Sequence, residues 1–277
     1  MTGIVETTWP NGETQFAGII GDPIAQVKSP AAVTAEFRDR GLNWALMPLH
    51  VSAEDLPSAL RGLDVLRNFS GLIATVPHKF AAFRHCKTAT ARATLLQAAN
   101  VARRNPDNSW HGDMVDGLGF VNALSSTGFV VAGQRSLVVG AGGAGTAIAH
   151  ALLEAGAAAV SVYDRDPKRA DALSTLLCGV GRYDVSTSPA PDPRGHTLIV
   201  NATPAGMHPD DPLPIMAEHL VPNMTVADVI TAPEVTPLLE TARNRGCVTQ
   251  TGAAMYFGLL NTMVDFITQA EGGDHHT

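Results

Sequence analysis

Short apolar runs alternate along the chain with longer segments in which apolar residues recur at helical spacing. The short runs predict strands and the longer segments predict helices. The strand-like runs cover residues 16–20, 44–51, 70–76, 136–139, 159–163, 196–201, 224–230 and 247–249, and the helical segments include 30–37, 90–99, 117–126, 146–155, 234–244 and 252–270. Strands that alternate with helices predict an α/β fold with a mostly parallel sheet. At 277 residues the chain is long enough for two domains.

A glycine-rich turn follows the run at 136–139 and opens a helical segment that ends at Gly156. Residues 140–145 supply one glycine for the turn, one for close approach of the backbone to a pyrophosphate, and one for helix–strand packing. The phosphates would bind N–H groups at the positive end of the helix. Asp164 ends the next run about twenty positions later, where a carboxylate meets ribose hydroxyls in dinucleotide-binding folds. An ordinary glycine-rich turn is the alternative, but strand, helix and acid together favour a dinucleotide site.

Composition and charge exclude several other classes of function. The net charge of −7 provides no basic field for nucleic acid or an anionic membrane. No apolar stretch reaches transmembrane length and the N-terminus lacks the pattern of a signal peptide, so we expect a cytoplasmic protein. Cys86, Cys178 and Cys247 lie far apart, which argues against disulfides and predicts buried thiols. His78 and His85 have no carboxylate at a spacing that completes a metal cluster, so no metal site is predicted.

Several short motifs occur in a fixed order along the chain. They are Gly21-Asp22-Pro23-Ile24 with Lys28-Ser29-Pro30, Thr75-Val76-Pro77-His78-Lys79, Ala99-Asn100, Gly112-Asp113 with Asp116-Gly117, Gly140 to Ala144, Asn201-Ala202-Thr203-Pro204 with Gly206-Met207, and Thr236-Pro237-Leu238-Leu239. Each is weak alone, but their order and spacing from residue 15 to about 266 resemble the shikimate dehydrogenase family. The resemblance implies an α/β substrate-binding domain (1–116 and 252–277) and a Rossmann-type dinucleotide-binding domain (117–251). The C-terminal helix would return to the first domain.

The resemblance also implies which residues form the site. A lysine–aspartate pair, Lys79 and Asp116, would face the substrate hydroxyl. Ser29, Thr75 and Asn100 fall on substrate-contacting positions, as do Val27, Ile73 and Leu259, where the residue type differs. The residues expected at the cofactor are Gly140, Gly142, Gly143, Ala144, Asp164, Arg165, Ala202, Thr203, Val229, Gly252 and Met255. Members of the family are monomers or homodimers, and the expected partner is a small hydroxy acid.

Lys79 and Asp116 suit the oxidation of a secondary alcohol. A hydride passes to nicotinamide, and the hydroxyl proton must be removed by a positioned amine or carboxylate. A neighbouring carboxylate raises the pKa of a lysine and desolvation lowers it, so the sequence leaves open which group holds the proton. The alternatives are an ordinary ion pair for these two residues, a turn or cap role for Asn100, and an N-cap role for Ser29.

The chain departs from the family pattern at positions where a hydrogen-bonding side chain is usual. Val27 replaces the first serine of a carboxylate clamp, Ile73 replaces an asparagine, and Leu259 replaces a glutamine. The other departures are Val101, Met114, Val115 and Thr231. A substrate polar group left unpaired on burial costs roughly 1–3 kcal/mol. We therefore expect a less polar substrate, a smaller polyol acid, or weak turnover of shikimate.

The nucleotide side departs as well. NADP-specific members have Asn-Arg-Thr where this chain has Asp164-Arg165-Asp166. A carboxylate at the first position favours ribose hydroxyls and repels a 2′-phosphate, although Arg165, Lys168 and Arg169 offset part of that repulsion. The sequence thus predicts a shikimate/quinate dehydrogenase-like oxidoreductase that uses NAD in preference to NADP. The alternatives are a non-catalytic NAD-binding regulatory protein that kept the fold, and a scaffold-like subunit.

Overall fold

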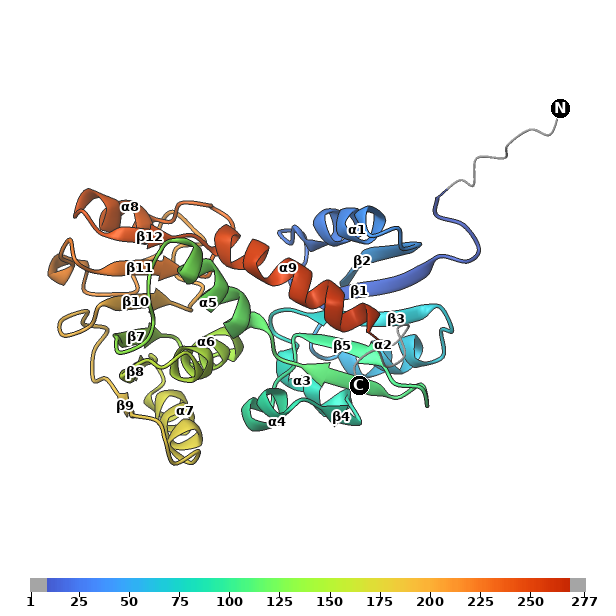
Figure 1. Ribbon diagram of the computed structural model, residues 1–277, viewed down its shortest axis with the longest axis horizontal. Coiled ribbons are helices and arrows are strands. Elements are labelled where there is room, and N and C mark those ends of the chain that lie inside the picture. The colour runs from blue at the N-terminus through green and yellow to red at the C-terminus, as the bar shows by residue number, and fades with distance from the viewer. Residues whose placement is uncertain (1–8, 270–277) are drawn as a thin grey trace. The chain divides into compact units, whose positions relative to one another are not determined.

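The computed structural model describes residues 9–269, and the chain divides into two compact units, each drawn in Figure 1. The first unit comprises residues 1–114 and 260–277, and the second comprises residues 115–259. The sequence predicted borders after residues 116 and 251. The later border falls inside the last helix, α9 (Gly252–Thr268), because the first half of that helix packs on the second unit.

The first unit is an α/β layer with a mixed sheet. Its elements are β1 (Gln15–Gly21), α1 (Ser29–Asp39), β2 (Trp44–His50), α2 (Leu56–Asp64), β3 (Phe69–Ala74), α3 (Lys79–His85), β4 (Thr88–Ala89), α4 (Ala91–Leu96), β5 (Val101–Arg104) and β6 (Trp110–Asp113). The strand order is β2-β1-β3-β5-β6-β4. β1 runs parallel to β2 and β3, as predicted, whereas β5 is antiparallel to β3 and β6. The short connection at 105–109 can join β5 and β6 only as antiparallel neighbours.

A buried apolar cluster supports this sheet. It contains Ile20, Leu56, Leu60, Phe69, Leu72, Ala74, Ala82, Ala102 and Trp110. The Phe69 and Trp110 rings meet edge to face with centroids 5.9 Å apart. Because the cluster draws on both β1 and β3, it fixes the carboxyl ends of these two strands against each other.

The second unit is a wholly parallel sheet with helices. Its elements are α5 (Asp116–Ser126), β7 (Arg135–Val139), α6 (Gly143–Glu154), β8 (Ala159–Tyr163), α7 (Pro167–Cys178), β9 (Val185–Thr187), β10 (Leu198–Asn201), η1 (Ala217–His219), β11 (Thr225–Asp228), α8 (Pro237–Asn244), β12 (Val248–Gln250) and the first half of α9. The strand order is β12-β11-β10-β7-β8-β9, and every neighbouring pair is parallel. The order of the strands reverses between β7 and β10, and ligands of such sheets bind beyond the carboxyl ends of the strands at that point.

The second half of α9 packs on the first unit through aromatic and aliphatic side chains. Ile267 lies against Gly71 of β3, where an added Cβ would be 2.5 Å from its methyl group. The Phe266 ring stacks on His111, with centroids 5.7 Å apart, and the Arg103 guanidinium lies 5.6 Å from the same ring. Arg103 and His111 face each other across the β5–β6 pair.

This arrangement predicts that acid weakens the first unit. The pKa of His111 lies below its ordinary value because of burial and then because of the Arg103 charge, which Asp113 partly opposes. The unfolded chain therefore binds the proton more readily, and the contribution of His111 to stability declines as the pH falls from about 6.5 through its folded pKa. His111→Phe keeps the stack on Phe266 without a titrating group. Urea unfolding at pH 7 and pH 5 should show a smaller loss of stability in this variant.

His196 of the second unit gives that experiment an internal reference. Its pKa is also lowered, chiefly by burial, and its proton linkage has the same sign. It is unchanged in His111→Phe and leaves some acid sensitivity in both proteins. An equal loss of stability in the variant and the unmodified protein would contradict the role given to His111.

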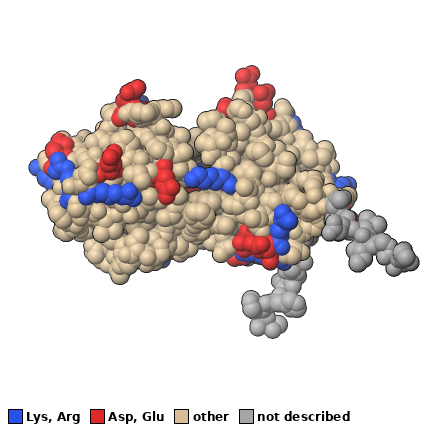
Figure 2. All heavy atoms as spheres, turned by 90° about the horizontal axis from the view of Figure 1, so that it is seen from above, with Lys and Arg blue, Asp and Glu red and all other residues tan. Residues whose placement is uncertain are grey.

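Surface charge, helix hydropathy and cysteine burial can each be compared with what the sequence predicts. Acidic and basic side chains are interspersed on the face drawn in Figure 2. No helix within residues 9–269 is both long and apolar enough to cross a membrane. Cys247 is buried and Cys86 is partly buried, but Cys178 is exposed, so the prediction of buried thiols is wrong for that residue. Cys178 is the last residue of α7, and its Sγ lies 3.4 Å from the carbonyl oxygen of Val185.

Candidate functional site

The carboxyl ends of β1 and β3 lie side by side and carry predicted substrate residues. The Thr75 N–H donates to the carbonyl of Ile20 at 2.9 Å, and the Asp22 N–H donates to the carbonyl of Val76 at 3.0 Å. These two bonds tie the loop after β1 to the loop after β3. Thr75 is half-buried against Gly21, where any side chain would overlap it.

Lys79 begins α3 directly after this edge and is half-buried. The preceding His78 is buried, with its Nε2 2.7 Å from the carbonyl oxygen of Val51. The carbonyl of Lys79 accepts a hydrogen bond from the Ala99 N–H at 3.0 Å. The start of α3 is therefore anchored on one side by His78 and on the other by the segment that contains Asn100.

Asn100 is 2% exposed and lies between two strand ends. Its N–H donates to the carbonyl of Asp113 at 2.9 Å, and its carbonyl accepts from the Ala74 N–H at 2.9 Å. Thr90 caps the preceding helix, since its Oγ1 accepts from the Ala93 N–H at 3.3 Å. Gln97 is the C-cap of the same helix, so Asn100 caps neither of its ends. The structure brings Lys79 and Asn100 together in the first unit.

Ser29 and Val27 come from the loop that leads into α1. Ser29 is the first residue of α1 and is buried, and no side-chain hydrogen bond caps this helix. The alternative of an N-cap role for Ser29 is therefore wrong; the helix starts one residue earlier than predicted and Lys28 takes the cap position. Val27 is half-buried. Ile73, in contrast, is 4% exposed within β3, between Ile19 and Val101 of the neighbouring strands.

The glycine-rich turn joins β7 to α6 as predicted. Gly140 has φ +105°, a conformation that side chains disfavour, and an added Cβ would lie 2.8 Å from the carbonyl oxygen of Ala202. A Cβ at Gly145 would overlap the carbonyl oxygen of Gly140. Gly142 is the N-cap of α6, and Gly142, Gly143 and Ala144 are partly exposed. The first turn of α6 therefore presents accessible N–H groups, the arrangement that binds phosphate.

Asp164 lies at the end of β8 beside this turn. One carboxylate oxygen accepts from the Ala141 N–H at 2.8 Å, and the other accepts from the Asp166 N–H at 3.0 Å. Arg165 is exposed, whereas Arg169 reaches the turn, with its Nη2 3.3 Å from the point where a Cβ of Gly142 would be. A carboxylate and a guanidinium therefore both border the predicted nucleotide site.

The remaining predicted cofactor residues follow β10 and β11 and begin α9. Ala202 lies against Gly140, and Thr203 donates through its N–H and Oγ1 to Oδ1 of Asn201, at 3.0 and 2.7 Å. Gly252 packs so closely on Val229 and Ile230 that a side chain would overlap their backbone. Met255 and Leu259 are buried and lie against Gly119 of α5. Ala202, Val229 and Gly252 thus follow the carboxyl ends of their strands, at the same edge of the sheet as the glycine-rich turn.

Asp116 begins α5 in the second unit and is 6% exposed. Two glycines set the position of this helix: a side chain on Gly117 would overlap the carbonyl of Ala147 in α6, and one on Gly119 would lie 2.7 Å from Cβ of Leu259. Before the helix, the buried Asp113 accepts from Met114 N–H at 2.7 Å and from Arg92 Nε at 2.8 Å. Asp116 is therefore held by close helix packing. Lys79 belongs to the first unit and Asp116 to the second.

Sequence reasoning overlooked a buried carboxylate next to the predicted cofactor residue Val229. Asp228 ends β11, is fully buried, and accepts hydrogen bonds from Ile230, Asn201 and Thr236. Burial raises its pKa, and the hydrogen bonds oppose that effect. An acidic residue at the carboxyl end of an apolar run was the available signal. Among the residues that the structure describes, no cluster of three or more His, Cys, Asp or Glu side chains is arranged to hold a metal.

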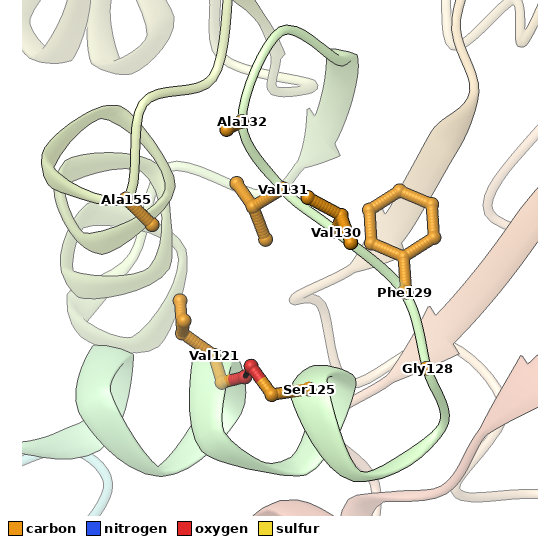
Figure 3. Close-up of a pocket in the computed structure, with 8 residues that line it drawn as sticks. All are labelled: Val121, Ser125, Gly128, Phe129, Val130, Val131, Ala132 and Ala155. Carbon is orange, nitrogen blue, oxygen red and sulfur yellow. Dashed lines mark hydrogen bonds between the residues drawn. The ribbon is translucent and has the colours of Figure 1, made fainter.

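A pocket elsewhere in the second unit does not include any of the predicted site residues. It has a volume of about 350 Å³ and is lined by Val121, Ser125, Gly128, Phe129, Val130, Val131, Ala132 and Ala155 (Figure 3). Most of its lining precedes β7, whereas the glycine-rich turn follows that strand. The pocket thus lies at the other end of β7 from the predicted nucleotide site.

Both halves of the chain match described protein families. Residues 19–102 match the "Shikimate dehydrogenase substrate binding domain", and residues 123–186 match "Shikimate / quinate 5-dehydrogenase". A shikimate dehydrogenase (NADP(+)) of Rubrobacter xylanophilus is 37% identical over 249 residues, which cover 88% of this chain and 87% of that protein.

Solved structures of two enzymes with different substrates share the fold. Ligand-free 5-ketofructose reductase of Gluconobacter sp. has a TM-score of 0.79 and 27% identity, and the match covers 94% of this chain and 99% of that one. Quinate dehydrogenase of Corynebacterium glutamicum in complex with NAD has a TM-score of 0.82 and 29% identity, with 92% and 94% of the two chains covered. The fold is therefore common to enzymes named for a ketose and for a hydroxy acid.

Proposed function

The chain belongs to the shikimate dehydrogenase family and is an NAD(P)-dependent oxidoreductase acting on the CH–OH group of a cyclic hydroxy acid, and from this premise we propose how its residues divide the work. The first unit binds the hydroxy acid and the second binds the dinucleotide. The observation that carries this assignment is the glycine-rich turn, which lies at the point of strand-order reversal in a parallel sheet.

Lys79 and Asp116 are the proposed catalytic pair. A bound nicotinamide supplies the hydride acceptor, or the hydride donor in the reverse direction. The Lys79 amine and the Asp116 carboxylate act as one coupled unit that takes the proton from the substrate hydroxyl, or returns it to the carbonyl oxygen. Asn100 and Thr75 orient the ring hydroxyls, and Ser29 donates to the substrate carboxylate. The hydrogen bond from Ala99 to the carbonyl of Lys79 fixes the start of α3, and close packing at Gly117 and Gly119 fixes the start of α5. Both catalytic groups therefore begin from fixed backbone positions.

The proposed substrate makes fewer polar contacts than shikimate. Val27 offers no donor to a carboxylate, and Ile73 is packed between aliphatic neighbours in β3. Met114 and Leu259 are also buried and apolar. A smaller polyol acid or a less hydroxylated ring fits these residues, because it leaves fewer of its own groups unpaired. The likeness to a reductase of 5-ketofructose supports a substrate range in this fold beyond shikimate and quinate.

The residues around the glycine-rich turn fit an adenine dinucleotide, and we propose that NAD is preferred to NADP. The partly exposed start of α6 offers N–H groups to the pyrophosphate. The Asp164 carboxylate is held at the turn by two backbone N–H groups and can accept ribose hydroxyls there. The Rubrobacter relative is named for NADP(+), and Arg169 beside Gly142 is the group here that favours a 2′-phosphate. The preference thus depends on which of the two charges dominates.

Asp164→Asn should shift that preference toward NADP. Loss of the carboxylate charge removes repulsion of the 2′-phosphate, and we expect the ratio of the two dissociation constants to change by about tenfold, or ~1.4 kcal/mol. Titration of the protein fluorescence with NADH and NADPH gives both constants. Asp171→Asn, an exposed acid on α7, is the matched control and should leave the ratio unchanged. Tighter binding of NADPH than NADH by the unmodified protein would refute the preference for NAD.

A substrate panel tests the function as a whole. Shikimate, quinate, their deoxy analogues and a neutral polyol are each supplied with NAD and with NADP, and reduced nicotinamide is followed by its absorbance. We expect turnover of at least one hydroxy acid, with shikimate not the best substrate. Dinucleotide binding without turnover of any alcohol would instead favour a regulatory protein that kept the fold.

We further propose that the protein acts in the cytoplasm as a monomer or homodimer, which fractionation and light scattering can test.

A further inference from the structure

Two loops that carry proposed cofactor residues are joined through a single buried carboxylate. The first loop, residues 202–206, follows β10 and contains Ala202 and Thr203. The second loop, residues 229–236, follows β11 and contains Val229. Asp228 lies between them at the end of β11 and is fully buried.

Both oxygens of Asp228 are engaged. Oδ1 accepts from the Ile230 N–H of the second loop at 3.0 Å. Oδ2 accepts from Nδ2 of Asn201 at 3.1 Å and from Oγ1 of Thr236 at 2.8 Å. The carboxylate thus contacts the start of the second loop, its end, and the strand residue from which the first loop departs.

Asn201 links Asp228 to the first loop through hydrogen bonds of its own. Its Nδ2 also donates to the carbonyl of Ala205 at 3.1 Å. Its Oδ1 accepts from the N–H of Thr203 at 3.0 Å and from the Thr203 hydroxyl at 2.7 Å. Both Nδ2 and Oδ1 of Asn201 therefore bond to the first loop. Asn201 is itself fully buried.

The sheet does not need this network to hold β10 and β11 together. The two strands are already paired in register from Leu198–Thr225 to Asn201–Asp228, and an apolar cluster that includes Ile199, Val226 and Leu239 covers them. The carboxylate acts beyond the last ladder pair, where the backbone leaves the sheet. A buried carboxylate is costly unless it is fully hydrogen-bonded, and here its bonds reach the two ends of the second loop and Asn201, which in turn bonds to the first loop.

We propose that Asp228 is a positioning residue for the dinucleotide: through Asn201 and Thr236 it holds the loops 202–206 and 229–236 in the one arrangement that contacts the cofactor. This inference rests on the proposed function, because it takes Ala202, Thr203 and Val229 as cofactor residues. Loops that already have the binding conformation lose less conformational entropy when the dinucleotide binds. The network therefore contributes to dinucleotide affinity. The alcohol site is formed by other residues and depends on the network only indirectly.

Three substitutions and one control test the proposal. Asp228→Asn leaves one acceptor where two are needed, and Thr236→Val removes the hydroxyl that donates to Oδ2. Thr236→Ser keeps that hydroxyl and also keeps the cap that Thr236 provides to the Leu239 N–H. Thr241→Val is the matched control, because its hydroxyl donates to the carbonyl of Pro237 in the same helix without reaching either loop.

Dissociation constants for NADH, thermal midpoints, and kcat and KM for the best alcohol are measured for each protein. We expect Asp228→Asn and Thr236→Val to weaken NADH binding by about tenfold, with KM for the alcohol and kcat at saturating cofactor nearly unchanged. Thr236→Ser should retain the affinity of the unmodified protein, and Thr241→Val should alter only the thermal midpoint. Faster amide exchange at Thr203 and Ile230 should accompany the weaker binding.

Two results would overturn the inference: unchanged NADH affinity in both Asp228→Asn and Thr236→Val, or an equal loss in Thr241→Val. The first would assign the network to stability alone, and the second would assign the loss to a general loosening of α8. Failure of the proposed function is read separately, on the unmodified protein. If that protein binds neither NADH nor NADPH, the cofactor site itself is wrong and the inference falls with it.

Discussion

Replacing Lys79 by methionine is expected to lower kcat by about 10²- to 10⁴-fold, the range over which a positioned acid or base contributes to proton transfer. Methionine retains the apolar stem and removes the amine. Lys79 is half-buried at the first position of α3, where its carbonyl is fixed to Ala99, so the substitution leaves the backbone anchor in place. Dinucleotide affinity should be unchanged because those contacts come from the second unit. Steady-state kinetics with the best alcohol of the panel measure the effect.

The control for this prediction is Lys87→Met. Lys87 is an exposed lysine of the same unit whose amine pairs with Asp107 at 2.6 Å, and its loss should leave kcat unaltered. Asp116→Asn should lower kcat to a similar extent as Lys79→Met. The double variant should be little slower than either single variant, because residues that act as a unit are strongly non-additive. Full activity of Lys79→Met would remove this residue from the mechanism, and multiplicative losses would mean that the two groups act independently.

The fold was predictable from the sequence where the hydrophobic pattern and the turn chemistry agree. The glycine-rich turn and β8 lie where the sequence predicts them, because Gly140 needs a positive φ and Gly145 leaves no room for a side chain, whereas α6 begins at Gly143, before the predicted segment 146–155. The antiparallel pairing of β5 and β6 was not predicted, since the alternation of strands and helices favours parallel neighbours. Pairing direction depends on the length of the connection, which the apolar pattern does not report.

The candidate site could be predicted as a set of residues but not as a set of contacts. Lys79, Asn100 and the predicted cofactor residues follow from motifs, and the structure adds contacts of their neighbours: His78 binds the carbonyl of Val51, and Gly117 and Gly119 let α5 pack closely. The Asp228 network escaped prediction because Asn201 lies 27 residues before Asp228 and meets it only when β10 and β11 pair. The sequence left an N-cap role for Ser29 open beside a substrate contact, because a serine before proline has the same local pattern whether its hydroxyl caps the helix or faces a ligand.

Restoring polar residues at the two most altered substrate positions is expected to raise kcat/KM for shikimate. A hydrogen bond to a charged group contributes about 1.5–3 kcal/mol, or roughly 10- to 150-fold. Val27→Ser returns a hydroxyl to the loop before α1, where the residue is half-buried and a smaller side chain is accommodated. We expect about tenfold from Val27→Ser, and about 100-fold when Ile73→Asn is added.

The two substitutions should differ in their effect on stability. Ile73 is 4% exposed between Ile19 and Val101, so asparagine there loses apolar burial and should lower the thermal midpoint, whereas Val27→Ser should barely change it. Val65→Ser, at an exposed valine after α2, controls for the chemical change itself and should affect neither measurement. A gain in shikimate turnover at Val27→Ser without a gain for a substrate that lacks the carboxylate would assign this loop to the carboxylate. An unmodified protein that already prefers shikimate, or a double variant with no gain, would mean that the aliphatic residues do not set the substrate range.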